Sequence, residues 1–72
     1  RLNVRVNAVA PGFIETDMID GIPEPVRKRV FAQIPMRSPG TPSDVARLVE
    51  FLAGEGGNYI TGQVIPVDGG MT

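Results

Sequence analysis

The chain has 72 residues, a net charge of −1, and neither cysteine nor histidine. Without these residue types the sequence excludes disulfides, thiol nucleophiles, Ser-His-Asp triads and the commonest metal ligands, and we predict no metal site. The small net charge argues against nucleic acid or an anionic membrane as a partner. No apolar run approaches the roughly 20 residues of a membrane span, and no secretory signal precedes the first strand pattern. A cytoplasmic location is therefore expected.

The composition limits how much this chain can bury by itself. Hydrophobic residues make up 42% of it, which is ordinary for a globular protein, so disorder is not expected. Chains below about 70–80 residues, however, rarely gain more than about 3–5 kcal/mol from a single core without a disulfide or a metal. Nine Gly and seven Pro also divide the apolar segments into short pieces. We therefore expect these elements to pack against more of the same fold or against another subunit.

The first predicted element is a strand at residues 2–10. Its alternate positions are apolar and share one face: Leu2, Val4, Val6, Ala8 and Ala10. A period of two is typical of a strand, and Val9 adds an apolar residue to the opposite face. The Pro11-Gly12 turn is expected to end the strand, because proline has no N–H to donate to a ladder. Apolar residues on both faces favour a parallel sheet that is covered on both sides.

Two stretches of different regularity follow. Residues 13–21 show no clear period and indicate a loop or a broken helix. Residues 23–34 predict a helix with a proline in its first turn and a partial apolar stripe. The basic cluster at residues 27–29 lies on this helix and indicates a solvated face more readily than a nucleic-acid site. Residues 36–40, which contain Pro and Gly, are expected to form a connection.

The clearest helix signal begins at Thr41. This residue fits an N-cap, with Pro42 in the first helical position and Asp44 as the acid of a capping box. An apolar stripe follows at helical spacing: Val45, Leu48, Val49 and Leu52. The glycines within residues 54–57 supply a stop. Because they follow the helix, a phosphate-binding loop, which would precede one, is the weaker interpretation.

The last predicted element is a strand at residues 63–67. Pro66 places it at a sheet edge or near a strand end, and residues 68–70 are expected to form an exposed turn. The order strand, helix, helix, strand is typical of one closing part of an α/β sheet. The acidic side chains within residues 15–20 lack the spacing of a calcium loop, so they indicate a solvated loop.

Two longer motifs resemble a known family. Residues 4–18 (VRVNAVAPGFIETDM) resemble the sixth strand and following loop of the short-chain dehydrogenase/reductase family, and residues 59–71 (YITGQVIPVDGGM) resemble its last strand and tail. Residues 34–37 and 40–46 fit the same family in the same order, and the similarity is greatest to the 3-oxoacyl-(acyl-carrier-protein) reductase type. The resemblance implies that residues 1–72 are the C-terminal segment of a single Rossmann-like domain, within a doubly wound parallel α/β sheet. The N-terminal dinucleotide-binding and catalytic portion would be absent.

The resemblance also implies a cofactor site at the end of the first strand. Pro11, Gly12, Ile14 and Thr16 would line the nicotinamide end of NADP or NAD, where an open α/β sheet binds its ligand. A carboxamide needs one donor and one acceptor, which the backbone of Ile14 can supply, and the Thr16 hydroxyl can donate to a carboxamide or phosphate oxygen. The alternative is that Pro11-Gly12 is only a strand-ending turn and Thr16 only a local helix cap.

The loop and helix that follow correspond in the family to a substrate-binding lid. The residues that would face an apolar acyl chain are Met18, Ile22, Val26 and Phe31. These side chains are equally suited to an ordinary core. Asn7, on the first strand, is expected to be a buried hydrogen-bonding residue rather than a catalytic one.

The sequence departs from a complete enzyme of this family in its proton-transfer residues. The family's Tyr-x-x-x-Lys motif is missing, because Gln63 follows Tyr59 at that spacing and Glu24 precedes Lys28. We therefore assign no catalytic residue and expect the chain alone to be inactive. In a complete enzyme it would belong to an NAD(P)-dependent oxidoreductase acting on a carbonyl or alcohol, such as a 3-oxoacyl thioester, and forming a homo-oligomer, in the family a homotetramer. The alternative is a truncated, non-enzymatic oligomerisation module.

Overall fold

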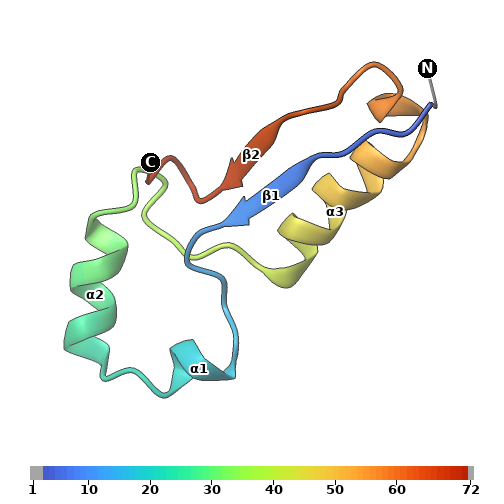
Figure 1. Cartoon of the computed structure of the whole chain (residues 1–72). Helices are drawn as coiled ribbons and strands as arrows, with labels where there is room; N and C mark the ends of the chain where they lie inside the picture. Colours follow the sequence, from blue (N-terminus) through green and yellow to red (C-terminus); the bar gives the residue numbers. More distant parts are fainter. Residues whose placement is uncertain (1–2, 72) are drawn as a thin grey trace.

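The computed structural model describes residues 3–71, apart from the side chain of Met18. The elements, in chain order, are β1 (Ala8–Pro11), α1 (Asp17–Asp20), α2 (Glu24–Ala32), α3 (Pro42–Ala53), a 3-10 turn η1 (Glu55–Gly57) and β2 (Val64–Val67) (Figure 1). The predicted order of strand, helix, helix and strand is confirmed, and the fold is α/β. The single turn α1 occupies the stretch predicted as a loop or broken helix. No helix in the described part is long and apolar enough to cross a membrane.

The two strands pair in parallel, with Ala8 opposite Val64 and Pro11 opposite Val67. The first strand was predicted to begin at residue 2. This prediction is wrong, because among the described residues the strand begins at Ala8. Here the Asn7 side chain replaces ladder bonds: its Nδ2 donates to the carbonyl of Ile60 over 3.1 Å, and its Oδ1 accepts from the Gln63 N–H over 3.1 Å. The hydrogen-bonding role predicted for Asn7 is confirmed, but the residue is half-buried and not buried.

The strand ends at the predicted Pro11-Gly12 turn, one residue later than Ala10, because Pro11 is still paired with Val67 and Gly12 lies outside the strand. The next residue supplies the missing donor, since the Gly12 N–H donates to the carbonyl of Val67 over 2.9 Å. The turn after β2 is less exposed than predicted. Asp68 and Gly69 are half-buried, because the chain there lies against Ile34: an added Cβ at Gly69 would come within 2.8 Å of Cγ2 of that residue.

Helix α3 has the predicted capping box at its start. The Thr41 N–H donates to the Asp44 carboxylate over 2.7 Å, and the Asp44 N–H donates to the Thr41 hydroxyl over 3.2 Å. The helix ends at the predicted glycine, Gly54, and it buries Leu52. Local capping and apolar spacing therefore determine this element together.

The capping box also gives the helix a pH dependence. The Thr41 backbone N–H, followed by the Thr41 side chain, lowers the pKa of the Asp44 carboxyl below its ordinary value of 3.8. Because the folded pKa is the lower one, the stabilisation is fully present above about pH 4 and is lost as the pH falls through the folded pKa. We expect the thermal unfolding midpoint of Asp44→Asn to fall less steeply with decreasing pH than that of the parent chain, because the variant has no carboxylate to protonate at this position. Parallel declines in the two thermal-melt series would contradict this.

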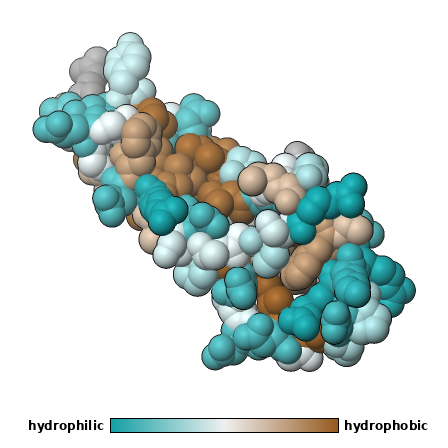
Figure 2. Space-filling model, turned by 180° about the vertical axis from the view of Figure 1, so that it is seen from behind, coloured by the Kyte–Doolittle hydropathy of each residue, from teal (hydrophilic) through white to brown (hydrophobic). Residues whose placement is uncertain are grey.

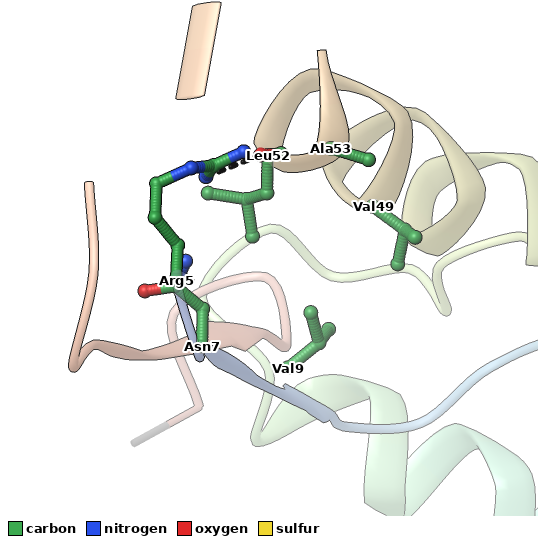
Figure 3. A pocket seen from close by; sticks show the side chains of 6 residues that line it. All are labelled: Arg5, Asn7, Val9, Val49, Leu52 and Ala53. Carbon is green, nitrogen blue, oxygen red and sulfur yellow. Dashed lines mark hydrogen bonds between the residues drawn. The ribbon is translucent and has the colours of Figure 1, made fainter. Parts of the chain in front are cut away.

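One face of β1 and the residues before it packs against α3 (Figure 3). The guanidinium of Arg5 donates to the carbonyls of Leu52 and Gly57, each over 2.7 Å, and to that of Ile60 over 3.3 Å. These carbonyls belong to the end of α3 and the loop after it, where a helix leaves acceptors without partners and where a positive charge is favoured. Arg5 therefore fastens the start of the chain to the C-terminal end of α3.

The opposite face of the sheet is open in the described part of the chain. Val4, Val6 and Val64 are 72%, 70% and 68% exposed. The accessible surface of 5606 Å² exceeds the roughly 4,300 Å² expected for a folded monomer of this mass. The radius of gyration is 14.9 Å, against about 11 Å for a compact domain of this length. Hydrophobic residues accordingly reach the surface across the middle of the molecule (Figure 2).

Candidate cofactor and substrate site

The candidate site begins where β1 ends, at Gly12. Its backbone passes so close to β2 that a Cβ would lie 2.6 Å from Cβ and 2.9 Å from Cα of Asp68. Only glycine permits this approach. The ends of the two parallel strands are therefore held together at one edge of the sheet, which is where open α/β sheets bind their ligands.

The backbone around Ile14 is hydrogen-bonded to Gly40 on one side and is left without hydrogen bonds on the other within the described residues. An isolated parallel bridge joins it to Gly40: the Gly40 N–H donates to the carbonyl of Phe13 over 2.9 Å, and the Glu15 N–H donates to the carbonyl of Gly40 over 2.7 Å. In such a bridge the flanking residues make the bonds, so the N–H and C=O of Ile14 point away from Gly40. Within residues 3–71 neither group has a hydrogen-bond partner.

Thr16 is the N-cap residue of α1, but its side chain does not cap the helix. Its backbone is extended, and no hydrogen bond runs from the α1 amides to its hydroxyl. Its carbonyl accepts from the Ile19 N–H over 3.0 Å. Thr16 therefore occupies the N-cap position without capping the helix through its side chain. Its exposed hydroxyl remains available to a ligand.

An open cavity of about 330 Å³ lies beside this backbone, between the end of β1 and α1. It is lined by Gly12, Phe13, Ile14, Thr16, Ile19 and Ile22. Four of these, all but Phe13 and Ile19, belong to the predicted site. Ile19 could not be identified from the sequence because residues 13–21 show no regular period; a turn in which the Ile22 N–H donates to the Ile19 carbonyl over 3.0 Å brings the two side chains together.

The remaining predicted site residues lie outside this cavity. Pro11 is in the β1 ladder, and Val26 is 38% exposed on α2. The ring of Phe31 packs edge-on against that of Phe13, with centroids 6.1 Å apart and planes at 82°, so it supports the cavity wall from behind. The side chain of Met18 lies outside the described residues.

The cavity leaves space beside the Ile14 backbone, but none of its lining side chains is suited to transfer a proton. None of the six is ionisable, so they offer shape, one hydroxyl and backbone dipoles. Tyr59 is fully exposed at 102%, and the Lys28 ammonium lies 3.6 Å from the Glu24 carboxylate. Tyr59 and Lys28 are the only tyrosine and the only lysine of the chain, and neither lines the cavity.

A sequence-family model described as enoyl-(acyl carrier protein) reductase matches residues 1–72, the whole chain. The chain belongs to the short-chain dehydrogenase/reductase family. It is 51% identical over 69 residues to the 3-oxoacyl-(acyl-carrier-protein) reductase FabG of Thermotoga maritima, covering 96% of this chain and 28% of that protein. It is 49% identical over 71 residues to the reductase MabA of Mycobacterium tuberculosis, covering 99% and 29%.

A solved structure of the same short-chain dehydrogenase/reductase type agrees in fold. YwfH, described as an NADPH-dependent reductase involved in bacilysin biosynthesis, superposes with a TM-score of 0.87 at 36% identity. The match covers 97% of this chain and 30% of that one. The strand–helix–helix–strand unit is therefore part of a Rossmann-like doubly wound sheet. The chain spans less than a third of the length of these relatives.

Proposed function

We propose that this chain acts as the C-terminal segment of a single Rossmann-like domain in an NADP- or NAD-dependent reductase of 3-oxoacyl thioesters. The observation that carries the proposal is the Ile14 backbone, whose N–H and C=O are fixed by the bridge to Gly40 yet bonded to nothing in the described part. A donor and an acceptor held in this way match a carboxamide. The rest of the fold would supply the proton-transfer residues.

The residues present fit the nicotinamide end of such a cofactor. Gly12 leaves the strand edge free of side chains, Ile14 would orient the carboxamide, and the uncapped Thr16 hydroxyl would donate to a carboxamide or phosphate oxygen. When bound, the cofactor supplies or accepts the hydride. These residues would fix the orientation of the ring and help exclude water from its reactive face.

The apolar wall of the cavity supports an acyl substrate. Ile19 is 7% exposed and Ile22 half-buried, and both line the space beside Ile14. Met18, Val26 and Phe31 would join them only if α1 and α2 close over the ligand as a lid. A carbonyl bound here would lie beside the nicotinamide end of the site, as hydride transfer requires.

The open sheet face supports the view that more of the same fold covers this chain. Burying an aliphatic side chain contributes about 1.5–3 kcal/mol, and Val4 and Val6 have no cover in the described part. A second candidate function, a non-enzymatic oligomerisation module, is favoured by the edge of β2 that has no partner strand within residues 3–71. An activity measurement distinguishes the two candidate functions, because a non-enzymatic module would associate with its partner without producing reductase activity.

A chimera tests the proposal directly. This chain would replace the aligned 69 residues of the Thermotoga maritima reductase, to which it is 51% identical. We expect the chimera to oxidise NADPH or NADH with a 3-oxoacyl thioester, and Thr16→Ala to raise the cofactor KM about fivefold or more, because one hydrogen bond contributes about 1–3 kcal/mol. Thr16→Ser, which keeps the hydroxyl, is the control. Equal cofactor affinity in all three proteins would contradict the role of Thr16.

The assembly of the chimera gives a further expectation. An exposed strand edge is a template for pairing, and Val64 is 68% exposed on β2. We propose that this strand lies at a symmetric interface of a homo-oligomer. Val64→Asp should then shift the species in sedimentation velocity to a smaller one, while the similarly shaped Val64→Thr should not. An unchanged sedimentation coefficient for Val64→Asp would place the interface elsewhere.

A further inference from the structure

Helices α1 and α2 lie on a segment that leaves the sheet and returns to it at one place. The Gly40 N–H donates to the carbonyl of Phe13 over 2.9 Å, and the Glu15 N–H donates to the carbonyl of Gly40 over 2.7 Å. These two bonds close a neck, and residues 15–39 between them are called here the lid segment. Figure 1 shows α1 and α2 standing apart from β1, β2 and α3. Since α2 buries none of its residues in the described part, its own packing holds it only weakly.

A second contact holds the lid segment shortly before it returns to the neck. Ile34 follows α2 and is 1% exposed, which makes it the most buried of the described hydrophobic side chains. It lies against the turn after β2, where an added Cβ at Gly69 would come within 2.8 Å of its Cγ2. The Met36 N–H also donates to the carbonyl of Gly69 over 3.1 Å. The turn after β2 therefore lies beside the connection after α2 (Figure 1).

The turn that contacts Ile34 also contacts the candidate cofactor edge. It is ordered by its own hydrogen bonds, because the Gly70 N–H donates to a carboxylate oxygen of Asp68 over 3.0 Å. Asp68 in turn lies against the end of β1, where an added Cβ at Gly12 would be 2.6 Å from its Cβ. Adjacent residues of one turn therefore touch the lid segment and the strand end at which the candidate site begins.

We propose that Ile34 and Gly69 are positioning residues for the substrate, because their contact holds the lid segment in place relative to the cofactor edge. The inference rests on the proposed function. Neither residue lines the candidate cavity, so neither touches the ligand itself. A segment attached only at its neck can rotate about that neck, and a second attachment removes the rotation. Loss of the contact lowers the fraction of molecules in which the apolar wall of α1 faces the cavity, and the apparent affinity for the acyl substrate falls by the same fraction.

Ile34→Ala in the chimera tests this role, because it removes the contact without pushing the turn. Opening of the lid segment is measured by trypsin cleavage within residues 27–29 of the native protein, mapped by mass spectrometry. We expect this cleavage to become about tenfold faster and the KM for a 3-oxoacyl thioester to rise about fivefold, with the cofactor KM within about twofold of the parent. Ile34→Val, which keeps a methyl group at the Cγ2 position, should behave like the parent. Leu52→Ala, a truncation at a residue 7% exposed on α3, is the control for a general loss of stability and should not favour cleavage within residues 27–29.

Gly69→Ala tests the same contact from the opposite side. The added methyl group would press on Ile34, and the φ of Gly69 is +64°. Gly62→Ala is the matched control for backbone strain, because its φ is +73° and nothing lies within 4 Å of its added Cβ. We expect Gly69→Ala, and not Gly62→Ala, to accelerate cleavage within residues 27–29. This pair decides the question if Ile34→Ala does not fold.

The other outcomes contradict the role of the contact or the proposed function, and they can be told apart. Unchanged cleavage in Ile34→Ala and Gly69→Ala, or equal acceleration in Leu52→Ala, would overturn the contact as the attachment of the lid segment. Faster cleavage with an unchanged thioester KM, or an equal rise in the cofactor KM of Ile34→Ala, would overturn its role in positioning the substrate. A folded chimera that reduces no thioester contradicts the proposed function alone, because trypsin cleavage still measures the attachment.

Discussion

Gly57→Ala is expected to lower the free energy of unfolding by about 3 kcal/mol. Gly57 is buried beneath the last turn of α3. An added Cβ would overlap the Leu52 carbonyl oxygen and lie 2.7 Å from both its carbonyl carbon and its Cα. These are backbone atoms that cannot rotate away, so the loop after α3 must move. Its carbonyls would then lose their positions on the Arg5 guanidinium.

Denaturant unfolding of the chimera measures this effect. Gly54→Ala is the matched control, because its nearest atom, the Glu50 carbonyl oxygen, is 3.2 Å from the added Cβ and its φ of −92° suits any residue. We expect the control to change the free energy of unfolding by less than about 1 kcal/mol. Similar losses in both variants would show that helix termination, and not the packing of Gly57, determines stability here.

Gly12→Ala is expected to reduce kcat/KM for the nicotinamide cofactor about 100-fold in the chimera. The added methyl group would force the end of β1 away from Asp68, the residue that follows β2. Since Ile14 lies only two residues further along the chain, its donor and acceptor would shift, and a displacement of about 1 Å can reduce turnover about 100-fold. Steady-state kinetics with varied cofactor, together with fluorescence titration of cofactor binding, measure the loss.

Gly62→Ala separates this steric effect from general backbone strain. Its φ is +73°, which disfavours alanine by about 1 kcal/mol or more, but nothing lies within 4 Å of the added Cβ. We expect it to lower stability and leave cofactor affinity unchanged. If both glycine variants lost the same stability and the same cofactor affinity, the role of Gly12 at the strand edge would be wrong.

Elements determined by neighbours in the sequence could be predicted, and those determined by distant groups could not. The start of α3 at Thr41 and its end at Gly54 follow from local hydrogen bonds. The start of β1 does not, because it depends on whether Asn7 bonds through its backbone or its side chain. Arg5 gave no sequence signal at all, since its acceptors lie 47, 52 and 55 residues away.

The candidate site shows the same division. Gly12, Ile14 and Thr16 lie together because they follow one strand end, which their sequence order already places at the sheet edge. Val26 and Phe31 lie elsewhere because the rotation of α2 depends on tertiary packing, and this helix buries no residue in the described part. The partial apolar stripe of α2 was too weak to fix that rotation from sequence.

The parallel pairing of β1 with β2 has a consequence for synthesis on the ribosome. Ala8 and its partner Val64 are separated by 56 positions. At a translation rate of about 5–20 residues per second, the first strand emerges roughly 3–11 seconds before the second. Throughout that interval the edge of β1 has no β2 to pair with, and the three acceptors of Arg5 are made only near its end. A nascent chain arrested before Val64 should therefore bind chaperones, and the addition of the last few residues should release it.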